Sequence, residues 1–439
     1  MLTAAQRTVS SMRRACCYPC LMPPNSLAAT APVARMAPAV IVVALTLLLG
    51  IQPITTDLYL PALPTLQRDL GASVGASQLT LSALILCFGL GQLVCGPLAD
   101  RYGRRPVLLT GLALYTAASL CSALAGSIEA LIGWRALQGA AMAAAVTCGR
   151  SIVRDLYQPH EGARVMSRAL SGLGVIAMLS PLTGGILVHW LDWHAALLAL
   201  VVYGAIALGY VAWQLEETVP LRNPAATRLG PLLRNWRAVV GHPTFRAWAA
   251  LSMFAYGGLF FILAASAFVY IELLGLSRIS YGVVMAVNSL AYIAGTFWCR
   301  RLLRRHGLRG AVKRGAWFTL AGGIGMAGLS LAGVHTVWAV LAPQLLFAVG
   351  HGVHQPCGQA GAVGPFPDKA GTAASLSGFA MTLAAFAVGL WLGRHLDGTV
   401  YPLTLGVAAC SAGLVTVAWT LVQRDGEAGS AAAPEPALS

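Results

Sequence analysis

The sequence predicts an all-α membrane protein with twelve transmembrane helices, and three observations support this prediction. Of the 439 residues, 57% are hydrophobic and only 10% are charged, whereas soluble chains average about 25% charged residues. The apolar residues form runs long enough to cross a bilayer, which takes about 20 residues. The few charges gather between these runs. Together the observations exclude a soluble fold, and a disordered or nucleic-acid-binding chain would carry more charge.

Twelve apolar runs lie between charged or turn-forming segments, with edges uncertain by several residues. Six occupy roughly 38–60, 77–98, 106–125, 130–153, 166–188 and 194–215. Six more occupy roughly 248–271, 281–299, 315–333, 336–357, 371–393 and 402–422. We therefore predict six-helix halves at 37–215 and 248–424, joined by a polar linker at 216–247. Residues 1–36 form an extension, or reflect an incorrectly assigned start because Met36 opens the first span, and 425–439 form a disordered tail.

The distribution of basic residues predicts the orientation of these spans. Most of the 29 Lys and Arg residues fall on one face of the twelve-span arrangement, while Arg68, Arg278 and Arg394 fall on the other. Basic residues favour the cytoplasmic side, so we expect both termini and the linker to be cytoplasmic. The net charge of +14 then reflects topology and indicates no nucleic-acid partner.

The loop between the second and third spans contains a motif whose physical role can be read directly. It runs Gly96-Pro97-Leu98-Ala99-Asp100-Arg101-Tyr102-Gly103-Arg104-Arg105. Gly96 permits close helix approach and Gly103 permits a turn. Asp100 and Arg104 stand four residues apart, where an ion pair can form at a helix end. Topology alone would require neither the acid nor the two glycines.

This loop resembles the signature of the major facilitator superfamily at every characteristic position. The end of the first span, Thr56 to Pro64, resembles the D-x-Y-L-P-x-x-P pattern of the Bcr/CflA branch of drug:proton antiporters, and Arg135 to Gly139 resembles the R-x-x-Q-G pattern of proton-coupled facilitators. The resemblance covers about 37–424. It implies a major facilitator fold with two six-helix halves, a substrate site near the midplane and alternating access. It further implies proton-coupled export of small drug-like compounds across the bacterial inner membrane by a monomer without a cofactor.

The fifth span departs from the G-P-x-x-G-G pattern of that branch, because Ser180 replaces the glycine before Pro181. Pro61 and Pro181 are still expected to bend their helices, and Gly184 and Gly185 to allow close packing. The departure weakens the implication of export over import. Proton-coupled transport of a small metabolite, such as an amino acid, a nucleoside or a polyamine, therefore remains an alternative.

Asp57 and Arg135 are the candidate proton-coupling residues. An acid inside a span is costly and usually faces a cavity, and partial burial favours the protonated form. The alternative is that Asp57 lies at headgroup depth and caps a turn. We expect Arg135 to act on Asp57 or on the substrate, unless its side chain extends to the membrane interface.

The resemblance also implies a cytoplasmic gate, in which the loop motif and Asp155 form an ion-pair cluster, with Asp100 also facing 370–372. Candidate substrate contacts are Tyr59, Gln138, Met142, Tyr256, Phe260 and Asn288, although ordinary packing accounts for the aromatic residues equally well. His351 and His354 share a helix face without a carboxylate partner, which favours packing over metal binding. The chain has no P-loop and no H-E-x-x-H motif, so we expect neither ATP use nor an enzyme. The expected partners are protons, a small-molecule substrate and the lipid bilayer.

Overall fold

The computed structural model describes residues 36–157, 159–219 and 222–427. Expectations about the N-terminal extension and about the tail beyond residue 427 therefore lie outside the described residues. Within these ranges the chain is all helical: it contains fourteen α-helices, short 3₁₀ and π segments, and no strand. The all-α prediction is confirmed.

The first half contains six helical crossings. The first is α1 (Pro38–Asp57), which continues through the 3₁₀ segment η1 (Leu60–Ala62) into α2 (Leu63–Asp69). The others are α3 (Val74–Tyr102), α4 (Arg104–Ala123), α5 (Ile128–Leu156), α6 (Pro159–Trp190) and α7 (Trp193–Gln214). Side chains of Ser73, Ser127 and Asp192 accept backbone N–H groups at the starts of α3, α5 and α7, which satisfies otherwise unpaired donors. Ser73 lies in a stretch that spells G-x-S-x-G, but it caps α3 after the helical segment α2, whereas the nucleophile of that motif sits on a strand-to-helix turn.

The second half follows a short helix in the linker, α8 (Leu229–Gly241), which linker composition did not predict. Its helices are α9 (Pro243–Ala267), which ends in the π-helical turn η2 (Phe268–Leu273), α10 (Arg278–Leu331) and α11 (Val337–Val363). They are followed by the 3₁₀ turn η3 (Pro367–Lys369), α12 (Ala370–His395), α13 (Tyr401–Trp419) and α14 (Leu421–Asp425).

Helix α10 contains two of the predicted crossings. Among the residues that the structure describes, eleven helical segments are long and apolar enough to cross a membrane, and α10 alone has 54 residues. Its backbone reverses at Gly307, where φ is 64°, a conformation that favours glycine. Gly295 before this point contacts Val349 of α11, and Gly315 after it contacts Val353. The two limbs therefore run side by side, and the prediction of twelve crossings is confirmed.

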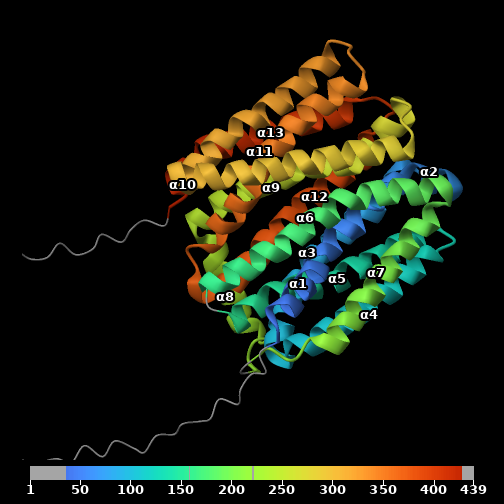
Figure 1. Ribbon diagram of the computed structural model, residues 1–439. Coiled ribbons are helices and arrows are strands. Elements are labelled where there is room, and N and C mark those ends of the chain that lie inside the picture. The colour runs from blue at the N-terminus through green and yellow to red at the C-terminus, as the bar shows by residue number, and fades with distance from the viewer. Residues whose placement is uncertain (1–35, 158, 220–221, 428–439) are drawn as a thin grey trace, which may run out of the picture. The chain divides into compact units, whose positions relative to one another are not determined.

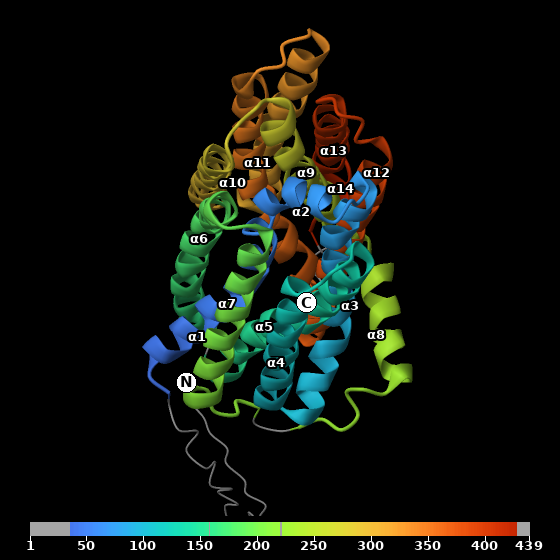
Figure 2. The same ribbon diagram turned by 90° about the vertical axis from the view of Figure 1, so that its right-hand side faces the viewer.

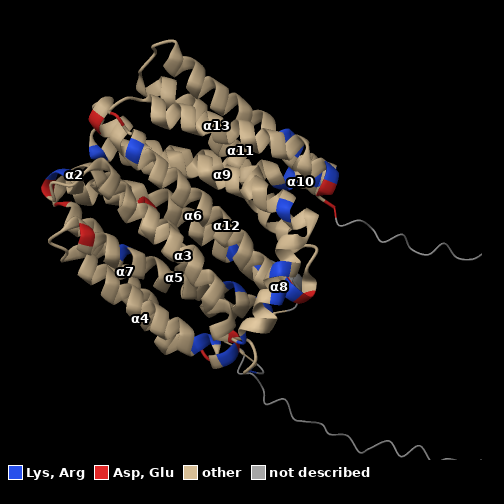
Figure 3. Cartoon of the chain, turned by 180° about the vertical axis from the view of Figure 1, so that it is seen from behind, with Lys and Arg blue, Asp and Glu red and all other residues tan. Residues whose placement is uncertain are grey.

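The helices form two groups, with α1 to α7 in one and α9 to α13 in the other (Figure 1). The groups meet mainly where α3 packs on α12 and where α6 packs on α10. We call the helix ends that carry Asp100–Arg105 the motif side. The opposite ends, which include α2 and the start of α10, are the far side (Figure 2). Acidic and basic residues gather at these ends and leave the middle of the helices almost free of charge (Figure 3).

Candidate functional site

The loop motif forms a charged cluster on the motif side. Arg104 begins α4 and is 4% exposed. Its Nη1 lies 2.6 Å from Asp100 Oδ1 and its Nε lies 3.0 Å from Asp155 Oδ2. The buried guanidinium thus has two carboxylate partners, one from the end of α3 and one from the end of α5. The predicted grouping of Asp100, Arg104 and Asp155 is observed.

Glu217, which sequence reasoning assigned only to the polar linker, completes this cluster. Its carboxylate accepts the backbone N–H groups of Arg104, at 2.8 Å, and of Arg105, at 3.3 Å. These are the first donors of α4 and have no partner within the helix. Gly103 makes room for this cap: its φ is 110°, and a Cβ there would collide with the Glu217 carboxylate. Thr218 also reaches Asp155, at 3.5 Å.

The remaining contacts of the motif stay within the first half and the linker. Arg101 Nη1 donates to Thr227 Oγ1 at 2.6 Å, and Arg105 Nη2 donates to the Ala212 carbonyl at 2.9 Å. We find no hydrogen bond or ion pair from Asp100 to 370–372 within the described chain. The expectation that Asp100 faces the start of α12 is not met in this state, since the Arg154 guanidinium approaches Gly371 there instead.

Arg135 lies in the packed interior of the first half. It has no exposed surface, and its Nη1 donates to Gln138 Oε1 at 2.6 Å while Nη2 donates to the Thr55 carbonyl at 3.2 Å. Its guanidinium also lies 4.3 Å from the centre of the Tyr59 ring, where a cation is attracted by the ring face. An arginine reaching the membrane interface is thereby excluded.

The Arg135 contacts extend into a wider polar network. Gln138 donates to Ser119 Oγ at 2.6 Å, and Thr55 shares a 2.6 Å hydrogen bond with Tyr115. Arg135 therefore links α1, α4 and α5. Its partners were only partly evident from sequence, because Ser119 and Thr55 look like ordinary small residues of apolar helices.

Asp57 lies on another face of α1 and makes no ion pair with Arg135 within the described residues. Its only side-chain hydrogen bond comes from Thr56 Oγ1, at 2.7 Å. The residue is partly exposed, and its charge acts on Tyr256 of α9 and on Tyr281 of α10. Asp57 thus lies near the second half, and the expected direct effect of Arg135 on Asp57 is not supported.

Opposite Asp57, the second half presents a chain of polar side chains. Tyr281 shares a 2.9 Å hydrogen bond with Ser266. Tyr270, whose ring centre lies 6.2 Å from that of Tyr281, donates to Gln344 Oε1 at 3.0 Å. Gln344 in turn donates to Asn288 at 3.2 Å. Of this group the sequence had singled out Asn288 as a substrate contact; Ser266 and Gln344 were missed, because single polar residues in apolar runs carry no distinguishing pattern.

The six candidate substrate contacts are buried in this state. Four of them have no exposed surface, namely Tyr59, Gln138, Met142 and Phe260, while Tyr256 and Asn288 keep 7% and 6%. The proposed face of Arg135, Gln138 and Met142 therefore points into the first half and does not line an open space here.

His351 and His354 are also buried. His351 packs against the rings of Phe347 and Tyr292. No group of three metal-binding side chains occurs in the described part of the chain.

On the far side the two halves are in contact. A Cβ on Gly185 of α6 would collide with the Arg278 carbonyl of α10 in the second half. Gly184 packs within the first half, where a Cβ would collide with the Leu58 carbonyl just after α1. Arg68 and Glu272 form an ion pair at 3.2 Å, and Arg278 donates to Thr65 at 2.9 Å. Pro61 and Pro181 lie within these helical segments.

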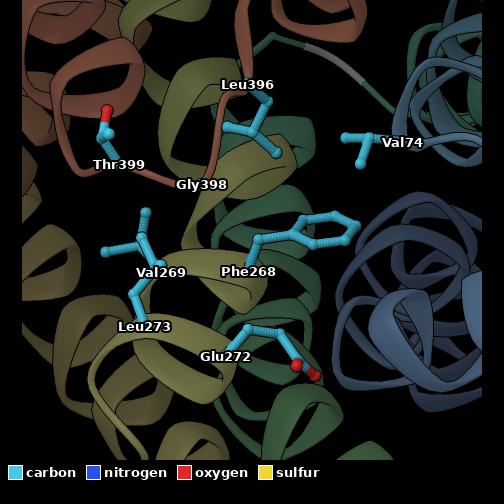
Figure 4. Close-up of a pocket in the computed structure, with 8 residues that line it drawn as sticks. All are labelled: Val74, Phe268, Val269, Glu272, Leu273, Leu396, Gly398 and Thr399. Atoms are coloured by element: carbon cyan, nitrogen blue, oxygen red, sulfur yellow. The ribbon is translucent and has the colours of Figure 1, made fainter.

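A small cavity of about 90 Å³ remains beside this contact, between α3, η2 and the loop after α12 (Figure 4). Its lining includes Val74, Phe268 and Leu396, with Glu272 at its edge (Figure 4). Sites for drug-sized ligands usually enclose about 300–1,000 Å³. This cavity is therefore a gap in the far-side contact and no substrate site.

Comparison with known proteins identifies the family. Residues 45–390 match the family model described as Major Facilitator Superfamily. Multidrug resistance protein D of Escherichia coli K12 is 31% identical over 76% of this chain and 83% of its own length. An uncharacterised MFS-type transporter of Bacillus subtilis is 32% identical over 58% of this chain, and the match spans 65% of that relative, just under two thirds.

The Bcr/CflA resemblance is supported as well, by the bicyclomycin resistance protein homolog of Haemophilus influenzae, which is 25% identical over 84% of this chain and 93% of that protein. Among solved structures, a D-xylose–proton symporter superposes with a TM-score of 0.68 over 88% of this chain and 98% of that chain, at 16% identity. That likeness concerns the fold alone. With its loop motif, twelve crossings and these relatives, the chain is a multi-pass membrane protein that belongs to the major facilitator superfamily.

Proposed function

We propose that the protein is a proton-coupled exporter of small drug-like compounds in the bacterial inner membrane. The names of its relatives, which include a multidrug resistance protein and a bicyclomycin resistance homolog, support export of antimicrobial compounds. The protein would act as a carrier and not as an enzyme. The motif side would be cytoplasmic, so a reporter that is active only outside the cytoplasm should stay silent when fused after Asp425.

The observation that carries the proposal is the position of Asp57. It is the twentieth residue of a helical span that runs from Pro38 to Asp69, well away from either end. The residue is partly exposed, its carboxylate has one hydroxyl donor, and it lies near Tyr256 and Tyr281 of the second half. A carboxylate at membrane depth is costly unless it is paired or protonated. Because no cation pairs with it in the described chain, protonation is the available way to neutralise it.

The transport cycle would start from the conformation seen here, in which the two halves are in contact on the far side. Here the two halves meet on the far side through Gly185 and the Arg68–Glu272 pair, so substrate would enter from the motif side. In other members of this superfamily substrate binds near the midplane between the halves. Substrate binding would disfavour the protonated form of Asp57, and protonation would disfavour bound substrate, by reciprocal linkage. Each charge that crosses 100 mV supplies about 2.3 kcal/mol.

The test is substrate-induced proton release from the purified protein in weakly buffered detergent. Adding a transported drug should release a proton from the wild-type chain and none from Asp57→Asn. Asp57→Asn should also lose uphill export in proteoliposomes. Asp69→Asn, at the end of the same span, serves as the control. Proton release that persists in Asp57→Asn would assign the coupling to another group.

A metabolite transporter would give a different result in the same proteoliposomes. Counterflow would then respond to amino acids, nucleosides or polyamines, and overexpression would leave drug susceptibility unchanged. A drug-susceptibility panel therefore separates the two functions before any variant is made.

A further inference from the structure

Helix α5 has one face that is not used for packing near the motif side. Ala144 packs against Gly111 of α4, and Cys148, one turn later, lies on the same face. Thr147 faces α3 through Gly96, and Gly149 faces α1 through Leu48. Successive helical residues are rotated by about 100°. The next position, Arg150, therefore lies between α1 and α3 on the side of α5 that faces away from α4.

Nearer the far side, α1 and α3 both pack against one face of α5. There Gly139 of α5 touches the Leu84 carbonyl of α3, and Arg135 touches Thr55 of α1. Gly139 and Arg135 point in almost the same direction, since four residues turn a helix by about 400°. Helices α1 and α3 therefore converge over α5 at this level and diverge toward the motif side, which leaves Arg150 facing the second half.

Arg150 has no partner for its charge among the described residues. Its side chain is exposed although protein atoms surround it, and it takes part in no ion pair or hydrogen bond there. One turn later, the Arg154 guanidinium approaches Gly371 of α12, so the second half lies directly across this space. Charges at membrane depth are usually paired and mark a substrate or ion pathway.

We propose that Arg150 is a specificity-determining residue that binds a carboxylate or similar anionic group of the substrate as it enters from the motif side. The inference rests on the proposed export function and names its substrate class: amphipathic compounds with one acidic group. A guanidinium offers a planar set of five donors that matches a carboxylate. The substrate carboxylate would supply the counter-charge for Arg150 that no described residue of the protein provides.

The position of Asp57 is compatible with an acidic substrate. Gly149 lies level with Leu45–Leu49 of α1, and Asp57 follows eight residues after Leu49. At 1.5 Å per residue this places Asp57 about 12 Å farther along the axis. An acid bound at Arg150 is thus separated from Asp57 by about 12 Å along the helix axis, and its charge is offset by the guanidinium that holds it.

The experiment compares binding of nalidixic acid and of its methyl ester to the purified full-length chain, without a proton gradient. The wild-type chain should bind the acid about ten- to a hundredfold more tightly than the ester, the range expected for one charged hydrogen-bonded pair. Arg150→Gln should remove this preference by weakening binding of the acid but not of the ester. Arg150→Lys, which keeps the positive charge, should retain part of the preference. Arg300→Gln removes an exposed arginine that lies over the Phe297 ring and should leave the preference unchanged.

Several results would overturn the proposal. The first is a wild-type chain that binds the acid no more tightly than the ester. The second is an Arg150→Gln variant that weakens binding of both compounds equally. The third is an Arg300→Gln variant that also loses the preference for the acid. Thermal melting of each variant identifies misfolding, in which case the Arg150→Lys result decides. Because binding is measured without a gradient, failure here leaves proton release at Asp57 unaffected, and the two proposals can fail separately.

Discussion

The cap on α4 gives the sharpest stability prediction. Glu217 accepts two backbone N–H groups at the start of this helix, at 2.8 and 3.3 Å, and its carboxylate also stands near the positive end of the helix dipole. Loss of a helix cap costs about 0.5–2 kcal/mol, and hydrogen bonds to charged groups contribute about 1.5–3 kcal/mol. Because Glu217 is only partly buried, we expect Glu217→Ala to destabilise the protein by about 1–3 kcal/mol.

The assay is thermal unfolding of the purified protein in detergent, followed by size-exclusion chromatography. Glu216→Ala is the matched control, because it removes the same charge one residue away from an exposed side chain. Glu217→Gln keeps one carbonyl oxygen as an acceptor and should fall between Glu217→Ala and the wild-type chain. Equal melting temperatures for Glu216→Ala and Glu217→Ala would refute the cap.

Two further predictions concern the gate and the far-side packing. Asp100→Asn removes one of the two carboxylates that pair with buried Arg104. The transport rate should therefore fall, while substrate binding and expression stay close to normal. A wild-type transport rate in this variant would show that the pair has no part in the gate. Gly184→Ala places a methyl group against the Leu58 carbonyl, and such overpacking costs about 1–3 kcal/mol. Gly184→Ala should therefore lower the melting temperature. The control Gly209→Ala, whose Cβ would meet nothing within 4 Å, should not. Equal melting temperatures for the two variants would contradict the close contact at Gly184.

The fold was predictable because each membrane span is specified by its own local stretch of sequence. An apolar run of about 20 residues specifies a crossing whatever surrounds it, so twelve crossings follow from the sequence. The linker helix α8 was not predicted, because its 13 residues are too few to cross a membrane and lie within a segment that was interpreted as a polar linker. The 54-residue α10 consists of two helices that meet at Gly307, and the charged segment around Gly307 separates these two crossings in the sequence as well.

The site was predictable only where its parts are close in sequence. Asp100 and Arg104 stand four residues apart, and that spacing alone indicated their ion pair. Glu217 lies 113 residues from Arg104, and nothing near it signals a cap. The partners of Arg135 were not predicted, for a related reason. A helical face can be read from spacing, but which neighbour that face meets depends on the packing of α1 and α4.

The distribution of contacts suggests how two rigid halves can still move against each other. Within the first half, the motif cluster joins α3, α4, α5 and the linker through a buried arginine. Between the halves, the far-side ion pair of Arg68 and Glu272 is 61% and 40% exposed. Exposed pairs contribute only about 0–1 kcal/mol, whereas removing one partner from a buried charge pair costs several times more. A buried charge pair thus ties helices of the first half together, whereas the ion pair between the halves on the far side is weak. A change of a few kcal/mol at Asp57 or at the substrate is then enough to shift the population from one state to the other.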